Sequence, residues 1–412
     1  MPYKVTKGGV CAPKGFLASA ISCGIKNGEK TRNDITLIYS EHPCTSAGTF
    51  TTNRVKAAPV KVTQAHLRAK PARAIIANSG NANACTGVKG LQDARTMAKE
   101  TARTLGLTQR EVAVCSTGVI GLPLPMDRMN GAWDELATRL HRKGGSEAAH
   151  AIMTSDTCPK EVAVTVDLDG CKVRIGACAK GAGMICPSMA TMLCFITTDA
   201  AVSPASLQKC TQDAVETSFN RISIDGDTST NDTVLVLANG AAGCPTVTRG
   251  SKAERQFRDA LQYVMLKMAK AIVRDGERVT KFVTVNVTGA ATFLDAKKVA
   301  EAVGKSALVK SSWNGNDPNW GRIIHAVGYS RARIREELID IDYDGKAACQ
   351  GGLVADTPLK TLRGIVEKDR FTININLHLG KAEYTLYTSD LSPEYIDFNR
   401  SEYAYWKNSK ID

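Results

Sequence analysis

The sequence predicts a protein of the α/β class, and three observations support this prediction. Residues 161–168 and 171–178 alternate between apolar and polar side chains on either side of Asp169-Gly170, a pair typical of a tight hairpin turn. Residues 254–274 instead carry apolar side chains at the spacing of a helix. Because the chain of 412 residues exceeds the ~150 typical of one domain, we expect two or three domains or one large sandwich.

Expected helices and strands alternate along the chain, without an internal repeat or a low-complexity stretch. In the helix predicted at 254–274, we expect the apolar stripe that includes Phe257, Leu261 and Met265 to be buried and the charged side chains to face solvent. We predict helices near 91–105, 130–142, 204–218 and 254–274, and strands near 74–76, 161–178, 195–198, 233–238, 282–287 and 371–377.

Charge and composition exclude several classes of partner. The 53 basic and 41 acidic residues give a net charge of +12. Aromatic residues are only 6% of the chain and the basic residues are dispersed, so we expect no nucleic-acid partner. The excess positive charge favours the approach of small molecules that carry carboxylates. There is no run of ~18 apolar residues and no signal-peptide core, so we predict a cytoplasmic protein without membrane contact.

The 13 cysteines fit a reducing compartment, because an odd number scattered through apolar segments does not form a disulfide framework. Cys171, Cys178, Cys186 and Cys194 lack the spacing of a structural zinc site, and the six histidines form no close pair. We therefore expect buried thiols and no metal.

Two other enzyme classes are disfavoured by missing residues. The chain has no G-x-S-x-G elbow of a serine hydrolase. Gly304-Lys305-Ser306 ends like a phosphate-binding loop, but Val299 stands where that loop requires its first glycine. We interpret this tripeptide as an ordinary loop.

The most informative motif is the glycine-rich stretch 180–191, which delivers Thr191 to the start of an apolar strand. A threonine hydroxyl needs a base before it can act as a nucleophile. If the chain broke between Ala190 and Thr191, the new α-amine, with a pKa of about 7.7–8.0, would supply that base within the same residue. The break would follow attack of the Thr191 hydroxyl on the Ala190 carbonyl, with Gly181 and Gly183 allowing a strained turn. The alternative is a loop that merely connects two strands.

Five blocks resemble the ornithine acetyltransferase family, the glutamate N-acetyltransferases of arginine biosynthesis. Residues 180–193, KGAGMICPSMATML, resemble the self-cleavage motif of that family. The match extends in the family's order from Gly9 to Asn399. The other blocks are ANSGNANACTG at 77–87, CSTGVIG at 115–121, FNRISIDGDTSTND at 219–232 and NDPNWGR at 316–322.

The resemblance implies an αββα-type sandwich similar to N-terminal-nucleophile hydrolases, followed by a smaller α/β domain. We place the main domain at 1–282 and the smaller one at 283–412. Self-cleavage would produce an α chain of residues 1–190 and a β chain of residues 191–412. The family pattern also implies assembly of two α and two β chains as a heterotetramer, without a cofactor or metal.

The resemblance also assigns roles to individual residues. Thr191 would be the nucleophile that takes acetyl from N-acetylornithine and passes it to glutamate by double displacement. Thr117 and Gly118 would form the oxyanion hole that stabilises the developing negative charge. Thr154 and Lys180 would contact substrate, Lys180 through the substrate's α-carboxylate or by assisting proton transfer.

Two further contacts depart in part from the family pattern. Glu277 is retained as a substrate-binding carboxylate, but Arg278 and Val279 replace the usual glycine and alanine beside it. Asn399 matches a substrate-pocket asparagine, whereas the terminal hydroxyl residue would fall at Ala404 or Tyr405. Three questions stay open: an aminopeptidase or amidohydrolase activity, a non-catalytic uncleaved binding protein, and the use of acetyl-CoA as a second donor.

Overall fold

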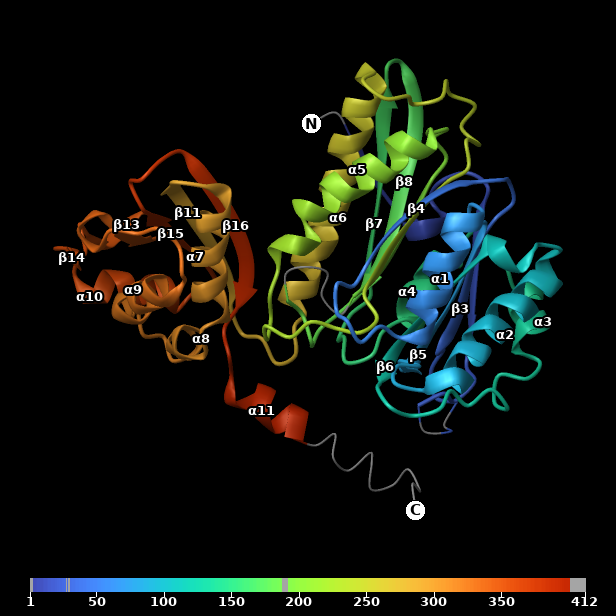
Figure 1. Ribbon diagram of the computed structural model, residues 1–412, viewed down its shortest axis with the longest axis horizontal. Coiled ribbons are helices and arrows are strands. Elements are labelled where there is room, and N and C mark those ends of the chain that lie inside the picture. The colour runs from blue at the N-terminus through green and yellow to red at the C-terminus, as the bar shows by residue number, and fades with distance from the viewer. Residues whose placement is uncertain (1–2, 27, 29, 187–191, 401–412) are drawn as a thin grey trace. The chain divides into compact units, whose positions relative to one another are not determined.

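The computed structural model describes residues 3–26, 28, 30–186 and 192–400, and it separates into two compact units (Figure 1). The first unit comprises the chain up to residue 220 together with 227–272. The second comprises 221–226 and the chain from residue 273 onward. We predicted a boundary at 282/283, and the units divide at 272/273.

The first unit contains two sheets with helices on their outer sides (Figure 1). A buried cluster joins the sheets, because Phe16 and Ile75 of the smaller sheet share it with Phe195 and Leu235 of the larger one. The larger sheet has the order β1 (Tyr3–Thr6), β7 (Lys160–Leu168), β8 (Cys171–Lys180), β9 (Leu193–Thr198), β10 (Thr233–Ala238) and β4 (Thr45–Phe50), and the smaller one the order β2 (Phe16–Ile21), β3 (Ile35–Ser40), β5 (Ala74–Asn81) and β6 (Val112–Val119).

Helices complete an αββα arrangement, which confirms the predicted fold class. Met97 of α2 and Trp133 of α3 are buried in a second cluster with the outer face of the smaller sheet. The helices α5 and α6 lie on the opposite side, beside the larger sheet (Figure 1). The helices of this unit are α1 (Ala58–Ala69), α2 (Gly87–Leu105), α3 (Ala132–Thr138), α4 (Gly145–Ala151), α5 (Pro204–Glu216) and α6 (Lys252–Arg274).

Local sequence signals account for the best-predicted elements. Asp169 and Gly170 have φ values of 54° and 90°, as the tight turn between β7 and β8 requires. The stripe of α6 is buried as expected, with Phe257, Leu261 and Met265 fully inside. The helix predicted at 130–142 is shorter in the structure, Ala132–Thr138. The Gly304-Lys305-Ser306 tripeptide is not a loop, because its first two residues end α7 (Phe293–Lys305) and its serine caps the next helix.

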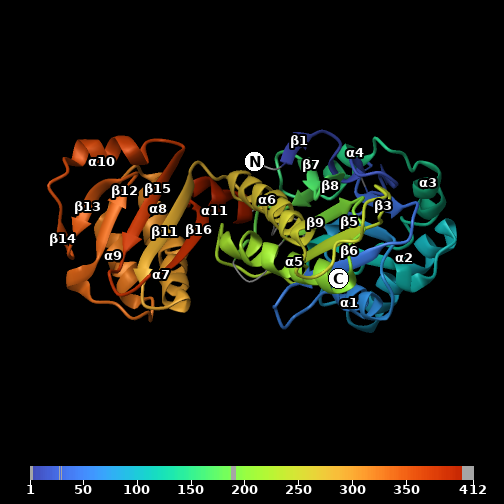
Figure 2. The ribbon, with the colours of Figure 1, turned by 90° about the horizontal axis from the view of Figure 1, so that it is seen from above.

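The second unit is built on one mixed sheet, whose strands follow one another in Figure 2. Its core contains Trp313, Tyr343 and Phe371. The sheet has the order β14 (Leu353–Val354), β13 (Lys346–Gln350), β12 (Asp340–Tyr343), β15 (Arg370–Asn376), β11 (Phe282–Ala290) and β16 (Ala382–Ser389), and the helices are α7, α8 (Ala307–Asn314), α9 (Trp320–Tyr329), α10 (Leu359–Val366) and α11 (Pro393–Arg400).

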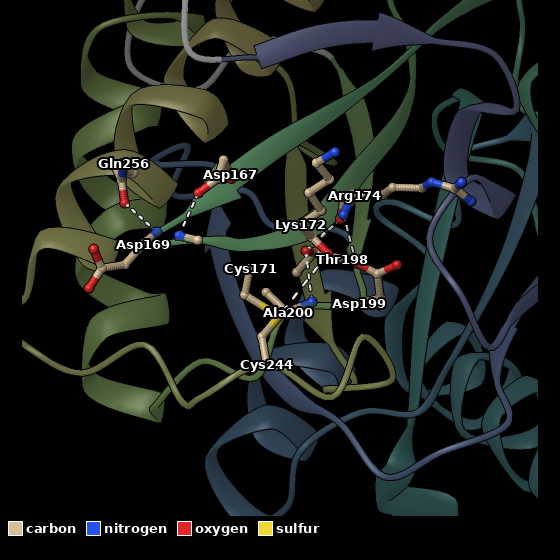
Figure 3. Close-up of a disulfide and its surroundings, with 11 residues drawn as sticks. Asp167, Asp169, Cys171, Lys172, Arg174, Thr198, Asp199, Ala200, Cys244 and Gln256 are labelled. Atoms are coloured by element: carbon tan, nitrogen blue, oxygen red, sulfur yellow. Dashed lines mark hydrogen bonds between the residues drawn. A yellow bond between two sulfur atoms is a disulfide. The ribbon is translucent and has the colours of Figure 1, made fainter.

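A disulfide joins Cys171, at the start of β8, to Cys244, in the loop after β10 (Figure 3). The expectation that the cysteines are all thiols is therefore wrong for this pair, because their Cα atoms lie 5.9 Å apart although 73 positions separate them in sequence. Cys178, Cys186 and Cys194 are buried, as predicted. Among the described residues, no helix is long and apolar enough to cross a membrane.

Candidate active site

Strand pairing brings Lys180 to the beginning of β9. The strands β8 and β9 are antiparallel, and Lys180 pairs with Leu193 in their register. The predicted nucleophile Thr191 stands two positions before Leu193 in sequence. Thr191 and its predicted cleavage partner Ala190 lie outside the residues that the structure describes. The register places Lys180 beside Leu193 at this end of the sheet.

Lys180 belongs to a buried polar network with Thr154. Its ammonium group donates a hydrogen bond to the Thr154 hydroxyl over 2.7 Å, and the side chain is only 3% exposed. Asp156 lies between Lys180 and a second buried lysine, Lys160, at 3.9 Å and 2.7 Å respectively. The Asp156 carboxylate also accepts the backbone N–H groups of Thr154 and Gly181. The two predicted substrate contacts of this unit are therefore in direct contact.

The charges in this network fix the ionisation of Asp156. Burial alone would raise the pKa of Asp156, but the charges of Lys180 and Lys160 and the Gly181 N–H outweigh it and lower the pKa to about 2. Two ammonium groups thus lie beside one carboxylate in a region almost closed to water. Such a site can bind a substrate carboxylate.

The predicted oxyanion residues Thr117 and Gly118 end β6, which pairs in parallel with β5. Gly118 has a φ of 134°, and a Cβ at this position would lie 2.3 Å from the carbonyl carbon of Gly80. Only glycine fits this approach between the two strands. The register of β5 and β6 shifts at Gly80/Asn81, next to the same contact. The end of β6 is therefore irregular.

Residues that we did not predict as site residues connect this strand end to β9. Asn231 and Asp232 directly precede β10. The Asn231 amide donates to the carbonyl of Ser116, beside Thr117, over 2.8 Å. The Asp232 carboxyl accepts the N–H of Met192, the residue after Thr191, over 2.9 Å. Both residues stand in one of the family-like blocks, but their sequence neighbours give no sign of these contacts.

Asp232 differs in charge from Asp156. Its side chain is fully buried. Burial raises the pKa of Asp232 well above its usual value, although the Met192 N–H, the Thr51 hydroxyl and the charge of Lys180 act in the opposite direction. Two buried carboxyls at the same end of the larger sheet thus have pKa values shifted in opposite directions.

The predicted contacts Glu277 and Asn399 lie together in the second unit. The Asn399 amide donates to the Glu277 carboxylate over 3.1 Å and also to the backbone carbonyl of Tyr395 over 3.0 Å. Arg278 has a left-handed φ of 57°, which explains why the family pattern has glycine there. Its guanidinium lies 5.0 Å from the centre of the Phe398 ring. Ala404 and Tyr405 lie outside the described residues.

The glycine-rich stretch departs from regular geometry before residue 187. Gly181 has a φ of 156°, close to extended backbone, whereas Met184 has a left-handed φ of 58°. The strained position within the described part of the motif is thus a methionine. Within the described ranges, no three histidine, cysteine, aspartate or glutamate side chains gather as they would to hold a metal ion.

Comparison with known proteins gives matches over almost the whole chain. Residues 17–404 match the ArgJ family. The chain is 47% identical over 395 residues to the arginine biosynthesis bifunctional protein ArgJ of Symbiobacterium thermophilum, covering 96% of this chain and 98% of that protein. It is 46% identical over 387 residues to the protein of the same name from Geobacter sulfurreducens, covering 94% of this chain and 98% of the relative.

Solved structures of similar sequence cover about half of the chain. The arginine biosynthesis bifunctional protein ArgJ of Bacillus halodurans is 37% identical, with a TM-score of 0.48 over 50% of this chain and 96% of the solved chain. The ornithine acetyltransferase of Mycobacterium tuberculosis, solved with ornithine, is 43% identical, with a TM-score of 0.42 over 45% of this chain and 98% of the solved chain. The extent and identity of the full-length matches confirm the resemblance inferred from the five sequence blocks: the chain belongs to the ArgJ family.

Proposed function

We propose that this chain cuts itself before Thr191 and then transfers acetyl from N-acetylornithine to glutamate through an ester on Thr191. The family assignment confirms the predicted enzyme class, an acyltransferase of arginine biosynthesis. The observation that carries the residue-level proposal is the register of β8 and β9. It pairs Lys180, held by Thr154 and Asp156, with Leu193, two positions after the proposed nucleophile.

The first step is an acyl shift within the chain. The Thr191 hydroxyl oxygen bonds to the carbonyl carbon of Ala190, the peptide C–N bond breaks, and the proton passes to the new α-amine. Water then hydrolyses the Ala190 ester, which leaves a carboxylate on Ala190 and restores the Thr191 hydroxyl. The released α-amine serves as the base for every later turnover.

Acetyl transfer repeats the same chemistry on a bound amide. The Thr191 oxygen attacks the acetyl carbonyl of N-acetylornithine, the C–N bond breaks, and the leaving ornithine nitrogen takes the proton held by the α-amine. The amine of glutamate then attacks the acetyl-threonine ester, and Thr191 leaves with its proton restored. Donors at Thr117 and Gly118 stabilise both tetrahedral oxyanions, and losing one such donor typically costs about 10²–10³ in rate.

The buried cations provide a reason for selecting amino-acid substrates. We assign Lys180 and Thr154 to the substrate carboxylate, because the Asp156 network holds the ammonium group of Lys180 in place beside the Thr154 hydroxyl. Glu277 and Asn399 are assigned to the amino-acid portion of a substrate, since their contact holds the Glu277 carboxylate in one orientation. Acetyl-CoA as a second donor, a cytoplasmic location and a tetramer of two α and two β chains complete the proposal.

The test separates transfer from hydrolysis on one sample. Purified protein is incubated with N-acetylornithine, with and without glutamate, and acetylglutamate and free acetate are both measured. The proposal predicts acetylglutamate that depends on glutamate and is absent with Thr191→Ala. Free acetate as the main product would instead identify an amidohydrolase, and an uncleaved chain without either product would identify a binding protein.

A further inference from the structure

We infer that Asn231 and Asp232 act as a clamp that sets the proposed nucleophile against the proposed oxyanion donors. The inference rests on the proposed function, because Thr191 and Thr117 take their roles from it. The two clamp residues are neighbours in sequence, and each holds a different strand end. Asn231 holds the end of β6, whereas Asp232 holds the residue before β9.

The contact of Asp232 fixes the backbone beside Thr191. Oδ1 of Asp232 accepts the N–H of Met192 over 2.9 Å. On the other side of the same residue, the Met192 carbonyl accepts the N–H of Thr233 over 3.0 Å. The backbone of Asp232 is held in turn, because its carbonyl accepts the N–H of Thr51 over 3.0 Å. Met192 is thus anchored through both of its backbone groups, one position from the nucleophile.

The contacts of Asn231 fix the strand that carries Thr117. Its amide nitrogen donates to the carbonyls of Ala82 and Ser116 over 2.7 and 2.8 Å, so both of its protons are used. Its amide oxygen accepts the Thr230 hydroxyl over 2.5 Å, and its backbone N–H donates to the Ser229 hydroxyl. A side chain with this many fixed partners has one conformation.

Because Asn231 and Asp232 are consecutive residues, the two strand ends that they hold are linked. Consecutive Cα atoms are held about 3.8 Å apart, so the strand ends fixed by Asn231 and Asp232 cannot shift independently. Acyl transfer depends on this spacing, because a displacement of about 1 Å between reacting groups can cost ~10² in rate. The clamp residues touch neither substrate nor the reacting atoms in this account, so they are positioning residues.

One atom of Asp232 argues against a purely structural role. Oδ2 is buried and, among the described residues, has no hydrogen-bond partner, because the nearby Thr51 hydroxyl donates to the carbonyl of Ser229 instead. A buried unsatisfied polar atom costs about 1–3 kcal/mol, and an apolar side chain of the same size would avoid that cost. Leucine would avoid it while giving up the bond to Met192. The presence of aspartate here is explained if the Met192 contact is needed for function.

The experiment compares substitutions that keep or remove this contact. Asp232→Leu keeps the size and removes the acceptor, whereas Asp232→Asn keeps an acceptor for the Met192 N–H. Asp199 is the matched control, since it is also buried and accepts the backbone N–H groups of Arg174 and Lys14, but at the other end of β9. Self-cleavage of folded protein is followed by intact mass under reducing conditions, and kcat and KM are measured on the cleaved fraction.

The clamp predicts a specific pattern of results. Asp232→Leu should slow cleavage and lower kcat by about 10²-fold with little change in KM, because positioning and not substrate binding is lost. Asp232→Asn should restore most of that loss. Asp199→Leu should lower the melting temperature without slowing cleavage of the folded fraction. If Asp232→Leu does not fold, Asn231→Ala provides the test, since it frees Ser116 and leaves the Met192 contact intact; it should lower kcat with KM little changed.

Two results would overturn the clamp. In one, Asp232→Leu, or Asn231→Ala in its place, behaves like Asp199→Leu. In the other, Asp232→Asn is as slow as Asp232→Leu, which would mean that the carboxyl itself and not its acceptor is required. Thr191→Ala separates these failures from failure of the proposed function. If Thr191→Ala still cleaves at the same bond, the nucleophile assignment is wrong, whereas if it is uncleaved and the Asp232 variants are normal, only the clamp is wrong.

Discussion

The two ends of strands β8, β9 and β10 are built from the same kinds of residue for different purposes. At one end, Cys171 is cross-linked to Cys244, and Asp199 accepts the backbone N–H groups of Arg174 and Lys14. Figure 3 shows the disulfide and the contact between Asp199 and Arg174. At the other end, Lys180 and Asp232 are buried without a cross-link, and Met192 leads to the proposed nucleophile. The strands between these two ends are almost entirely apolar inside.

The difference lies in how each end uses buried charge. Each carboxylate oxygen of Asp199 accepts one backbone N–H group, which is a common way to satisfy backbone donors where a strand meets a loop. Asp156 also accepts two backbone N–H groups, but it pairs with two buried lysines as well. Asp232 leaves one carboxyl oxygen without a partner among the described residues. Buried charge and unsatisfied polar atoms lower stability, so a functional role can explain why they are retained. We therefore assign stability to the disulfide end and chemistry to the Lys180 end.

The largest effect is expected from Thr191→Ala. Without the hydroxyl there is no nucleophile for the peptide bond or for the acetyl group, so cleavage and transfer should both be lost. The measurement is intact mass together with acetylglutamate formation. As a control, Thr198→Ala removes a buried threonine hydroxyl at the other end of β9 and should still yield cleaved, active protein.

The second effect concerns the buried ions around Asp156. Asp156→Asn removes the carboxylate that pairs with the buried Lys160 and Lys180, and breaking a buried ion pair typically costs about 3–5 kcal/mol in the free energy of unfolding. Asp213→Asn is the control, because it breaks a surface pair with Lys209 that is worth less than about 0.5 kcal/mol. Urea unfolding in the uncleaved Thr191→Ala background measures both. Equal losses for the two variants would contradict the described network.

The third effect belongs to the disulfide end. Cys171 and Cys244 fall on opposite sides of residues 190/191, so the disulfide would join the two products of self-cleavage. On a denaturing gel, wild-type protein should run as one species without reductant and as two with reductant. Cys171→Ser should show two species in both gels, lose about 2–4 kcal/mol of stability and cleave at an unchanged rate. Slower cleavage in Cys171→Ser would contradict the assignment of stability to the disulfide end and of chemistry to the Lys180 end.

The smallest effect is a difference in pH dependence between two carboxyls. The pKa of Asp156 is lowered to about 2, so its contribution is present above the unfolded pKa and lost as pH falls toward the folded one. The pKa of Asp232 is raised, so the folded protein keeps a proton that the unfolded chain releases above about pH 4. Stability therefore falls as pH rises from the unfolded toward the folded pKa of Asp232.

Asp232→Asn removes this proton linkage and leaves that of Asp156. In the uncleaved Thr191→Ala background, its unfolding free energy should decline less than that of the parent as pH rises above about 4. Urea unfolding at several pH values measures the slope. A slope equal to that of the parent would show that Asp232 is ionised in the folded protein.

Much of the fold could be predicted because its signals are local. Strand patterns stand on both sides of Asp169-Gly170, and all the apolar positions that identify α6 lie within that one helix. Each of these elements can therefore be recognised from its own residues. The disulfide could not be predicted, since Cys171 and Cys244 come together only through the packing of the larger sheet. An odd number of cysteines gave no sign of a single pair.

Some residues of the candidate site could likewise be recognised from the sequence, whereas others could be found only in the structure. The glycine-rich stretch before Thr191 could be recognised as chemically unusual, and the resemblance named Thr117, Gly118 and Lys180. The Asp156 network and the Asn231–Asp232 clamp could not be found from spacing, because Lys180, Ser116 and Met192 reach these residues only through the packing of distant strands. Asp232, for example, contacts Met192 from 40 positions away. Buried polar contacts of this kind depend on the finished fold.

The most direct test of the central claim is to trap the acyl-enzyme. Cleaved protein is mixed with N-acetylornithine without glutamate, quenched in acid, reduced, digested and analysed by mass spectrometry. We predict a peptide that begins at Thr191 and carries one added acetyl group on the hydroxyl, which disappears when glutamate is supplied before the quench. A chain that is cleaved at this bond and turns over, yet never carries acetyl on Thr191, would contradict the account.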